Sequence, residues 1–221
     1  MRKLIFVGAH PDDIELDCGG TIAYFANKGY NIECIFLTNG QAGGDPVQRQ
    51  EESINACISL GVRDNSMIKF GTFEDRRVLE TFDVIDYLEN LYYTEVDGRK
   101  KADPDVHAVF IHSPDDVHQD HRAVAECCRT AFRHAPRIFA YEAPSATASF
   151  NPTSFVNISG FVISKWNALT CHRSQIELGR AYIEYKAMLR LASFRGSQFG
   201  VPFAEAFQTL KNQIDVCLAK R

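Results

Sequence analysis

The sequence predicts a single α/β domain built on a mostly parallel sheet that helices cover. Short apolar runs alternate with amphipathic segments through the first half of the chain, which is typical of strand–helix–strand units. The length of 221 residues fits one domain with a substantial core, and 45% hydrophobic and 24% charged residues are ordinary for a soluble protein. Because no internal repeat, low-complexity tract or linker interrupts the sequence, we expect one domain over residues 1–221.

Each expected strand is a short apolar run bounded by polar or glycine-containing segments. In chain order these runs cover residues 4–7, 32–37, 67–70, 106–111, 138–141 and 155–158. The Gly-rich segment 40–45 and the segment 143–154, which is rich in Pro, Ser and Thr, are expected to be loops.

The expected helices carry apolar residues at helical spacing. They cover residues 20–28, 47–60, 78–92, 120–133 and most of 166–191, and a last turn or helix is expected at 203–211. The spacing is clearest in 78–92, with apolar residues at Val78, Leu79, Phe82, Ile85, Leu88 and Leu91. Gly61 is the expected C-cap of the second helix.

The charge and cysteine content exclude some classes of protein. A net charge of −4 and a pI near 6.0 argue against a nucleic-acid binder, although a phosphorylated or nucleotide-linked small substrate stays open. The seven cysteines are scattered and show no CxxC spacing, which indicates thiols in a reducing cytoplasm. The apolar run in residues 1–8 is too short for a signal peptide, and no stretch is long enough for a membrane span. We therefore expect a soluble cytoplasmic protein.

The first strand leads into a cluster of potential metal ligands, G-A-H-P-D-D-I-E at residues 8–15. In an open parallel sheet, ligands bind beyond the carboxyl ends of the strands. A histidine and two carboxylates within four residues are energetically costly to crowd together without a cation, and imidazole with carboxylate is a ligand set suited to zinc. The alternative is a solvated Asp-Asp turn with an incidental histidine. Gly19 and Gly20 also suggest a dinucleotide-binding turn, but the G-x-G-x-x-G fingerprint is absent.

A second cluster, S-P-D-D-V-H-Q-D-H at residues 113–121, follows the fourth expected strand at the same end of the sheet. His118 and His121 share a face if this segment is already turning into a helix. A catalytic zinc site typically has three protein ligands, so His10 and Asp13 need one more. Either histidine can ligate while the other does proton or oxyanion work, and Asp120 can orient one imidazole.

At these residues the chain resembles the LmbE-like, or PIG-L-type, de-N-acetylases. The matching segments are AHPDDIE (9–15), CGGTIA (18–23), LTNG (37–40), RQEE (49–52), LGV (60–62), PDDVHQDH (114–121) and ALTCHRSQ (168–175). The resemblance implies a Rossmann-like, three-layer αβα fold with one divalent metal per chain, normally zinc. It also implies removal of the N-acetyl group from an N-acetylated amino sugar, such as N-acetylglucosamine, or a glycoconjugate. Relatives often assemble into trimers or hexamers.

The resemblance also assigns roles to residues. It implies His10, Asp13 and His121 as the metal ligands, which also accept iron, cobalt or manganese. It implies Asp12 as the general base and His118, in its protonated form, as the group that stabilises the oxyanion. Asp120 would favour that charged form. Where many relatives have glycine, this chain has Asp17, which bears on substrate preference.

Further residues are candidates for binding the substrate. Arg49 matches a family arginine that would face the substrate, or else it is a surface arginine paired with Glu51 or Glu52. His172 matches the family in a segment that suggests a pocket wall or a subunit contact, and a structural histidine is the alternative. The remaining candidates are Tyr141 and Glu142 for sugar hydroxyls, whereas three other histidines are expected to be structural: His107, His112 and His134.

Two functions from other classes compete with a deacetylase. A non-catalytic nucleotide- or sugar-binding Rossmann module would not need Asp12 between two ligands, so the intact Pro-Asp-Asp triplet counts against it. A metal-dependent esterase or phosphoesterase can use the same zinc. Two-metal phosphatases need further ligands, and the sequence offers one ligand set.

Overall fold

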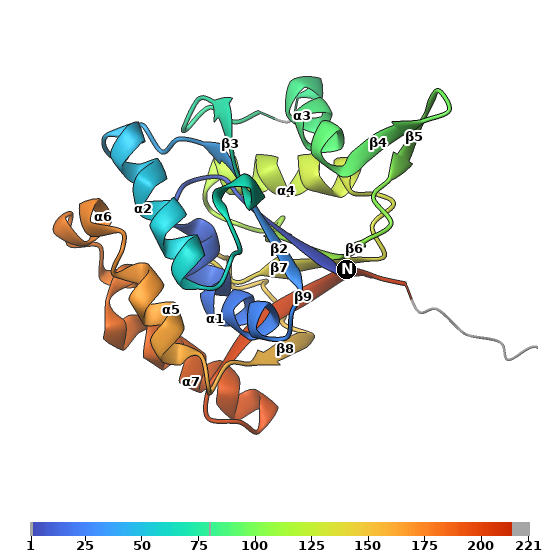
Figure 1. Cartoon of the computed structure of the whole chain (residues 1–221). Coiled ribbons are helices and arrows are strands. Elements are labelled where there is room, and N and C mark those ends of the chain that lie inside the picture. Colours follow the sequence, from blue (N-terminus) through green and yellow to red (C-terminus); the bar gives the residue numbers. More distant parts are fainter. Residues whose placement is uncertain (1, 80, 214–221) are drawn as a thin grey trace, which may run out of the picture.

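The computed structural model describes residues 2–79 and 81–213. Its main sheet has seven strands in the order β3-β2-β1-β6-β7-β9-β8 (Figure 1). The strands are β1 (Lys3–Gly8), β2 (Asn31–Thr38), β3 (Ile68–Phe73), β6 (Val106–His112), β7 (Arg137–Tyr141), β8 (Ser154–Asn157) and β9 (Ala204–Asn212). The first five of these pair in parallel, whereas β9 runs antiparallel to both β7 and β8. The predicted α/β fold with a mostly parallel sheet is confirmed.

Helices cover both faces of this sheet (Figure 1). They are α1 (Asp13–Asn27), α2 (Pro46–Ser59), α3 (Phe82–Tyr92), α4 (Gln119–Ala131), α5 (Val162–Leu169), α6 (Arg173–Glu177) and α7 (Tyr185–Phe199), with 3-10 turns η1 (Asn65–Met67) and η2 (Ala181–Ile183). In β1, Ile5 and Val7 pack into one cluster with α3 and α4, whereas Leu4 and Phe6 pack into another with α1 and α2. Since both faces of a parallel strand are buried, its sequence is apolar throughout.

The strand order creates a crevice at the centre of the sheet. From β1 the chain builds β2 and β3 on one side, and it then returns to build β6 and β7 on the other side of β1. The carboxyl ends of β1 and β6 therefore meet at a topological switch point, which is where open α/β sheets bind ligands. Both histidine-containing motifs begin at this point.

The first helix begins at Asp13, well before the expected start at residue 20. The Asp13 carboxylate accepts hydrogen bonds from the backbone N–H groups of Ala9 and His10, at 3.0 and 2.8 Å. A carboxylate in the first turn of a helix is favourable because the helix dipole is positive there. The first motif thus ends inside a helix, which fixes the direction of the Asp13 side chain.

The expected helix at 203–211 is wrong, because this segment is strand β9. Apolar residues at 203, 206, 207 and 210 fit helical spacing, but tertiary contacts decide the outcome. Glu205 is buried, and its carboxylate accepts hydrogen bonds from the Gly20 and Thr21 N–H groups and from Lys165 Nζ, at 2.9, 2.7 and 2.6 Å. These bonds tie β9 to α1 and α5, and no pattern in the sequence indicates them.

The long helix expected over 166–191 is divided into α5, α6, η2 and α7. Gly179 adopts a left-handed conformation with φ of 66° between α6 and η2, which a continuous helix does not allow. Three residues around this break, Gln175, Arg180 and Tyr182, line the crevice.

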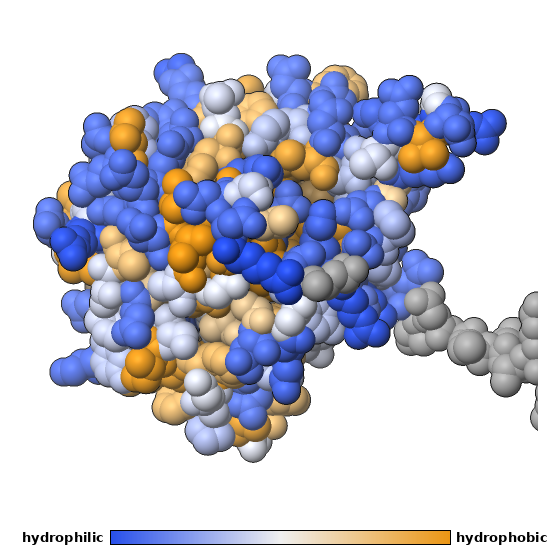
Figure 2. Space-filling model, in the orientation of Figure 1, coloured by the Kyte–Doolittle hydropathy of each residue, from blue (hydrophilic) through white to orange (hydrophobic). Residues whose placement is uncertain are grey.

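A hairpin of β4 (Tyr93–Val96) and β5 (Arg99–Ala102) was not predicted. Its turn is Asp97-Gly98, with φ of 54° and 68°, and an Asp-Gly pair between strands is a strong hairpin signal. The hairpin projects from the body of the molecule, and Figure 2 shows that hydrophilic residues cover most of it.

Within residues 2–79 and 81–213, no helix is long and apolar enough to cross a membrane. The cysteines in these ranges are free thiols, at Cys18, Cys34, Cys57, Cys127, Cys128 and Cys171.

We expect Gly196→Ala to destabilise the fold. Gly196 lies inside α7, where alanine is normally favourable, but an added Cβ would lie 2.6 Å from the carbonyl oxygen of Val201 and 2.7 Å from that of Pro202. The free energy of unfolding in urea should fall by about 1–3 kcal/mol, as for overpacked positions. Ser193→Ala, at an exposed position of the same helix, is the control and should cause no loss. Equal stability of Gly196→Ala and the unchanged protein would contradict the close approach.

Candidate active site

A cavity of ≈ 340 Å³ opens at the carboxyl ends of β1 and β6. Six parts of the chain line it: the segments after β1, β2, β3, β6 and β7, and the segment from α6 to η2. The predicted metal-binding and acid–base residues that reach it are His10, Asp12, Asp13, His118 and His121. The two motifs, more than a hundred residues apart in the chain, therefore form one site.

Asp13 is the centre of this site. Its Oδ2 accepts the two backbone hydrogen bonds from the loop after β1, and it lies 3.0 Å from His112 Nε2 at the end of β6. It also lies 3.4 Å from His10 Nδ1, while Oδ1 faces His121 Nε2 at 3.5 Å. Burial raises the pKa of Asp13, but the charges of His121, His112 and His10 outweigh this effect and hold it well below its ordinary value. Asp13 is therefore a carboxylate at neutral pH.

Two of the three imidazoles next to Asp13, those of His10 and His121, also contact other carboxylates through their second ring nitrogen. The Nε2 of His10 lies 3.1 Å from Asp120 Oδ2 and 3.3 Å from Asp75 Oδ1. The Nδ1 of His121 lies 3.1 Å from Asp116 Oδ2. Carboxylates that hold the distal nitrogen of a ligating imidazole fix its tautomer and orientation, and they are a regular feature of metal sites.

The residues present fit one divalent cation. Ligand atoms of His10, Asp13 and His121 lie within 4.8 Å of one another. Among the described residues, two overlapping groups also meet this criterion, namely His10–His118–Asp120 and His112–Asp116–His121. In each of these two overlapping groups, the carboxylate already contacts a ring nitrogen of one of the group's own histidines. The group of His10, Asp13 and His121 is therefore the better candidate for the metal ligands. Two imidazoles and one carboxylate are a ligand set that zinc accepts.

The cluster carries protons that a cation would displace. Burial lowers the pKa of His121, but the charge of Asp13 and the contact with Asp116 raise it to about 9. Burial likewise lowers the pKa of His10, and Asp13 and Asp120 raise it well above the ordinary value. Without a metal, both rings are protonated at neutral pH.

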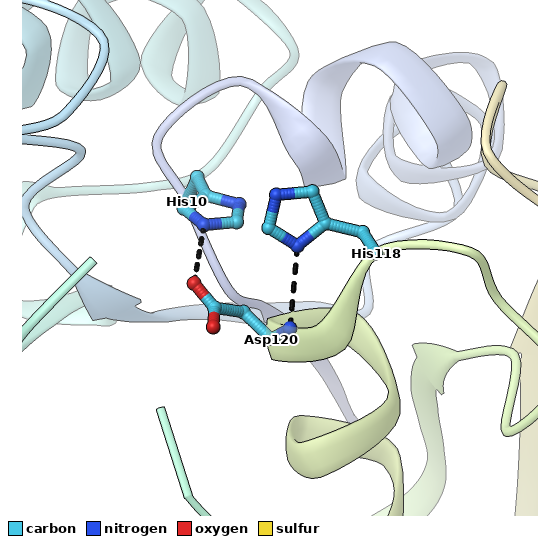
Figure 3. Close-up of side chains that lie close together, drawn as sticks. All are labelled: His10, His118 and Asp120. Carbon is cyan, nitrogen blue, oxygen red and sulfur yellow. Dashed lines mark hydrogen bonds and ion pairs between the residues drawn. The ribbon is translucent and has the colours of Figure 1, made fainter. Parts of the chain in front are cut away.

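His118 lies beside this cluster as a neutral side chain. Its Nδ1 accepts a hydrogen bond from the backbone N–H of Asp120 at 3.2 Å, so the ring carries its proton on Nε2 (Figure 3). Burial lowers its pKa, and the charges of His121 and His10 lower it further. This differs from the expected protonated His118 supported by Asp120. Figure 3 shows that the Asp120 carboxylate points to His10 instead.

Asp12 has a strained backbone and lines the cavity. Its φ is 112°, a region that non-glycine residues avoid, and such strain often marks functional positions. Burial raises the pKa of Asp12 to about 6, although the Arg49 guanidinium nearby opposes this effect. Its Oδ1 lies 3.2 Å from Arg49 Nη2. Asp12 is therefore ionised but basic at neutral pH.

Arg49 is buried and bonds the loops around Asp12. Its guanidinium donates to the carbonyl oxygens of Pro11 at 2.5 Å and Gly40 at 2.9 Å. It contacts neither Glu51 nor Glu52 through an ion pair among the described residues, and the Glu52 carboxylate accepts hydrogen bonds from Ser174 instead. Gly40 has φ of 65°, and a Cβ there would overlap Arg49 Nη1. The glycine of the L-T-N-G segment makes room for this arginine.

The other candidates for substrate binding lie elsewhere. Glu142 forms a two-point ion pair with Arg195 of α7, and it lines a second cavity. His172 is fully buried, with its Nε2 3.3 Å from Glu15 Oε1. Neither is among the described residues that line the main cavity. Tyr141 is also fully buried and donates its hydroxyl to the Val7 carbonyl oxygen at 2.8 Å, so it does not reach a sugar.

Sequence reasoning missed several residues of the site. His112, expected to be structural, contacts Asp13, and Asp75 and Asp116 hold His10 and His121. Asp116 stands in the second motif, so its position was a usable signal. Asp75 follows a weak strand without any motif. Asp17 lines the cavity, and its role in substrate preference stays a prediction.

Comparison with protein families identifies the group to which the chain belongs. Residues 5–132 match the model of the family described as PIG-L: GlcNAc-PI de-N-acetylase. The chain is 35% identical over 175 residues to the uncharacterized deacetylase YaiS of Escherichia coli (strain K12), covering 78% of this chain and 91% of that protein. The chain belongs to the PIG-L family. It is also similar to the diacetylchitobiose deacetylase of Thermococcus kodakarensis, at 24% identity over 94% of this chain and 83% of that protein.

Solved structures share the fold of this PIG-L protein. The conserved protein TT1542 from Thermus thermophilus matches with a TM-score of 0.80 and 25% identity, over the full length of both chains. GalB, the 4-carboxy-2-hydroxymuconate hydratase from Pseudomonas putida KT2440, matches with a TM-score of 0.78 and 20% identity over 99% of this chain and 100% of that chain. Since a hydratase has the same fold, the fold alone does not decide the reaction.

Metal affinity should increase with pH. His121, with a pKa of about 9 in the metal-free protein, must lose its proton to bind a cation, and so must His10. The apparent affinity for Zn²⁺ should therefore rise from neutral pH toward about 9. Calorimetry in buffers of different ionisation enthalpy should detect the released protons. An affinity that does not change over this range would contradict the arrangement.

His121→Ala should remove the metal. The unchanged protein is expected to hold one equivalent per chain after loading and desalting, and the variant close to none, because one of three ligands is lost. His107→Ala is the control, since His107 lies on β6 outside the cavity and should leave metal content unchanged. Full metal content in His121→Ala would assign the third ligand to another residue, with His118 as the first alternative.

Proposed function

We propose that this protein is a zinc-dependent hydrolase that removes the N-acetyl group from an N-acetylated amino sugar or glycoconjugate. The observation that carries the proposal is an ionised, basic Asp12 beside a buried group of His10, Asp13 and His121 in one cavity. The names of relatives support the reaction, since they include a diacetylchitobiose deacetylase. His10, Asp13 and His121 would hold the zinc, which supplies a Lewis acid that activates water for attack on the acetyl carbonyl.

Asp12 is the proposed general base. It is not needed as a ligand, and a pKa of about 6 makes it a better proton acceptor than an ordinary carboxylate while it remains ionised at neutral pH. Arg49 fixes its orientation through the contact at 3.2 Å. After the attack, Asp12 holds the proton that the leaving amine requires, so the same side chain can return it.

His118 is the proposed oxyanion donor, in its neutral form. Its Nδ1 is bonded to the Asp120 N–H, so the proton on Nε2 is available for the oxygen that becomes negative in the transition state. A neutral donor is consistent with a neighbouring cation, which would further disfavour an imidazolium. Asp120 keeps two tasks, because its backbone orients His118 while its carboxylate orients His10.

Other reactions make different demands on the same residues. A non-catalytic sugar-binding module gains nothing from a strained Asp12 with a raised pKa, and strain costs stability. An esterase or phosphoesterase would release an alcohol or phosphate instead of an amine. Localisation in the cytoplasm and assembly into trimers or hexamers stay predictions, which fractionation and light scattering can test.

The overall proposal is tested by amine release from N-acetylglucosamine derivatives, by the protein loaded with zinc. We expect free amine and acetate in equal amounts, loss of both after treatment with a chelator, and recovery when zinc is restored. Acetate release that is unaffected by complete metal removal would contradict the zinc-dependent reaction.

Asp12→Asn should lower kcat by about 10²–10⁴-fold, the usual effect of losing a general base. His118→Gln should lower kcat by about 10²–10³-fold, the usual effect of losing an oxyanion donor. Both variants should keep one zinc per chain, because neither residue is a ligand. Asp115→Asn, at an exposed position of the second motif, should keep full kcat. Full turnover by metal-loaded Asp12→Asn would show that another group accepts the proton.

A further inference from the structure

Three of the acidic side chains that line the cavity, those of Asp12, Asp13 and Asp75, are already engaged. Asp13 faces the histidines, and Asp12 faces Arg49. Asp75 accepts a hydrogen bond from the backbone N–H of Ala42 at 2.9 Å and faces His10. Two arginines that line the same cavity, Arg76 and Arg180, have no such partner. Across residues 2–79 and 81–213, no carboxylate forms an ion pair with either of them.

Arg180 has the more constrained side chain of the two. It follows Gly179 at the break between α6 and η2, and it is partly buried. Its Nε is buried and makes no hydrogen bond to any residue that the structure describes. The guanidinium carbon lies 5.9 Å from the ring centre of Tyr182, which also lines the cavity. A guanidinium nitrogen that loses water without gaining an acceptor is costly, so its position indicates a ligand that supplies one.

The backbone of Arg76 is fixed by a hydrogen bond, whereas its side chain forms no ion pair among the described residues. Its φ is 67°, and its N–H donates to Asp120 Oδ2 at 2.6 Å. The side chain is exposed at the cavity. The neighbouring Arg77 differs, because its guanidinium pairs with Glu74.

The two segments that carry these arginines both contact one loop, at 40–44. On one side the backbone of Ala42 bonds to Asp75, the residue before Arg76. On the other side Gln175, which precedes Arg180 on the α6 segment, donates from Nε2 to the Gly43 carbonyl oxygen at 3.1 Å. The loop thus joins the segments of two cavity-lining guanidinium groups, neither of which forms an ion pair with a residue that the structure describes.

We infer that the substrate carries an anionic group, a carboxylate or a phosphate, on the amino sugar or its substituent, and that Arg180 binds this group with help from Arg76. That the substrate is an N-acetylated amino sugar rests on the proposed function. Guanidinium groups bind carboxylates and phosphates through paired, charge-assisted hydrogen bonds, which are stronger than those between neutral groups. A neutral sugar would leave both guanidinium groups without a negatively charged partner.

The test compares kcat/KM for neutral and anionic substrates on the zinc-loaded protein. The neutral substrate is the methyl glycoside of N-acetylglucosamine. The phosphate arm uses N-acetylglucosamine 1-phosphate and 6-phosphate, and the carboxylate arm uses N-acetylmuramic acid. We expect at least one anionic sugar to exceed the neutral one by about ten-fold or more, as one charge-assisted bond allows. The arm that does so identifies the anionic group.

Arg180→Met should lower the ratio of anionic to neutral kcat/KM by about ten-fold, and Arg76→Met should lower it less, because Arg76 is exposed. Arg190→Met and Arg77→Met are matched controls at exposed positions and should keep the ratio. A merely structural role of Arg180 would lower kcat/KM for all sugars alike and leave the ratio unchanged, which would overturn the inference.

The inference and the proposed function fail in different ways. Hydrolysis of neutral and anionic sugars at equal rates keeps the function and overturns the inference. If no sugar is hydrolysed, the proposed function fails, and calorimetry with the same sugars tests the anion site alone. Tighter binding of an anionic sugar that Arg180→Met abolishes supports the site, and equal or absent binding overturns it.

Discussion

The carboxylate of Asp13 joins the segments on which the site is built. Its Oδ2 accepts hydrogen bonds from the backbone after β1 and contacts His112 at the end of β6, while its Oδ1 faces His121 in α4. These elements meet only because β1 and β6 are adjacent in the sheet. A buried carboxylate is tolerated when donors and cations surround it, and here they come from three separate parts of the chain. The geometry of the site therefore depends on one side chain in the first turn of α1.

The charges around Asp13 explain why a cation fits here. Asp75 and Asp120 contact the imidazole of His10, and Asp116 contacts that of His121. Together with Asp13, four carboxylates therefore surround these two histidines. Protons on the imidazoles compensate part of this charge in the metal-free protein, which is why their pKa values are raised. A divalent cation can replace those protons and keep the carboxylates paired. His118 lies outside this arrangement of carboxylates, and its pKa is lowered by burial and by the charged histidines beside it.

The sequence was sufficient for the parts of the site that local rules control. Apolar runs located the central strands, and the rule that ligands gather at carboxyl ends brought the two histidine-containing motifs together. The choice of His121 over His118 as a ligand came from the family resemblance. It was insufficient where a contact joins distant segments. Asp75 lies in a loop without a motif, and His112 is the last residue of an otherwise apolar strand. Strand β9 has helical spacing, but a place between β7 and β8 and the buried carboxylate of Glu205 override that preference.

Asp12 and Asp13 show how the fold gives neighbouring carboxylates different chemistry. The turn at Asp12, with φ of 112°, places Asp13 among the histidines and Asp12 beside Arg49. Histidine charges hold the pKa of Asp13 well below its ordinary value, which favours a ligand that never binds a proton at neutral pH. Burial raises the pKa of Asp12, and Arg49 limits that rise to about 6. If Arg49 were absent, burial would favour the protonated acid, which cannot accept a proton from water. The same arginine bonds to Pro11 and Gly40, so the group that keeps Asp12 ionised also fixes its place in the cavity.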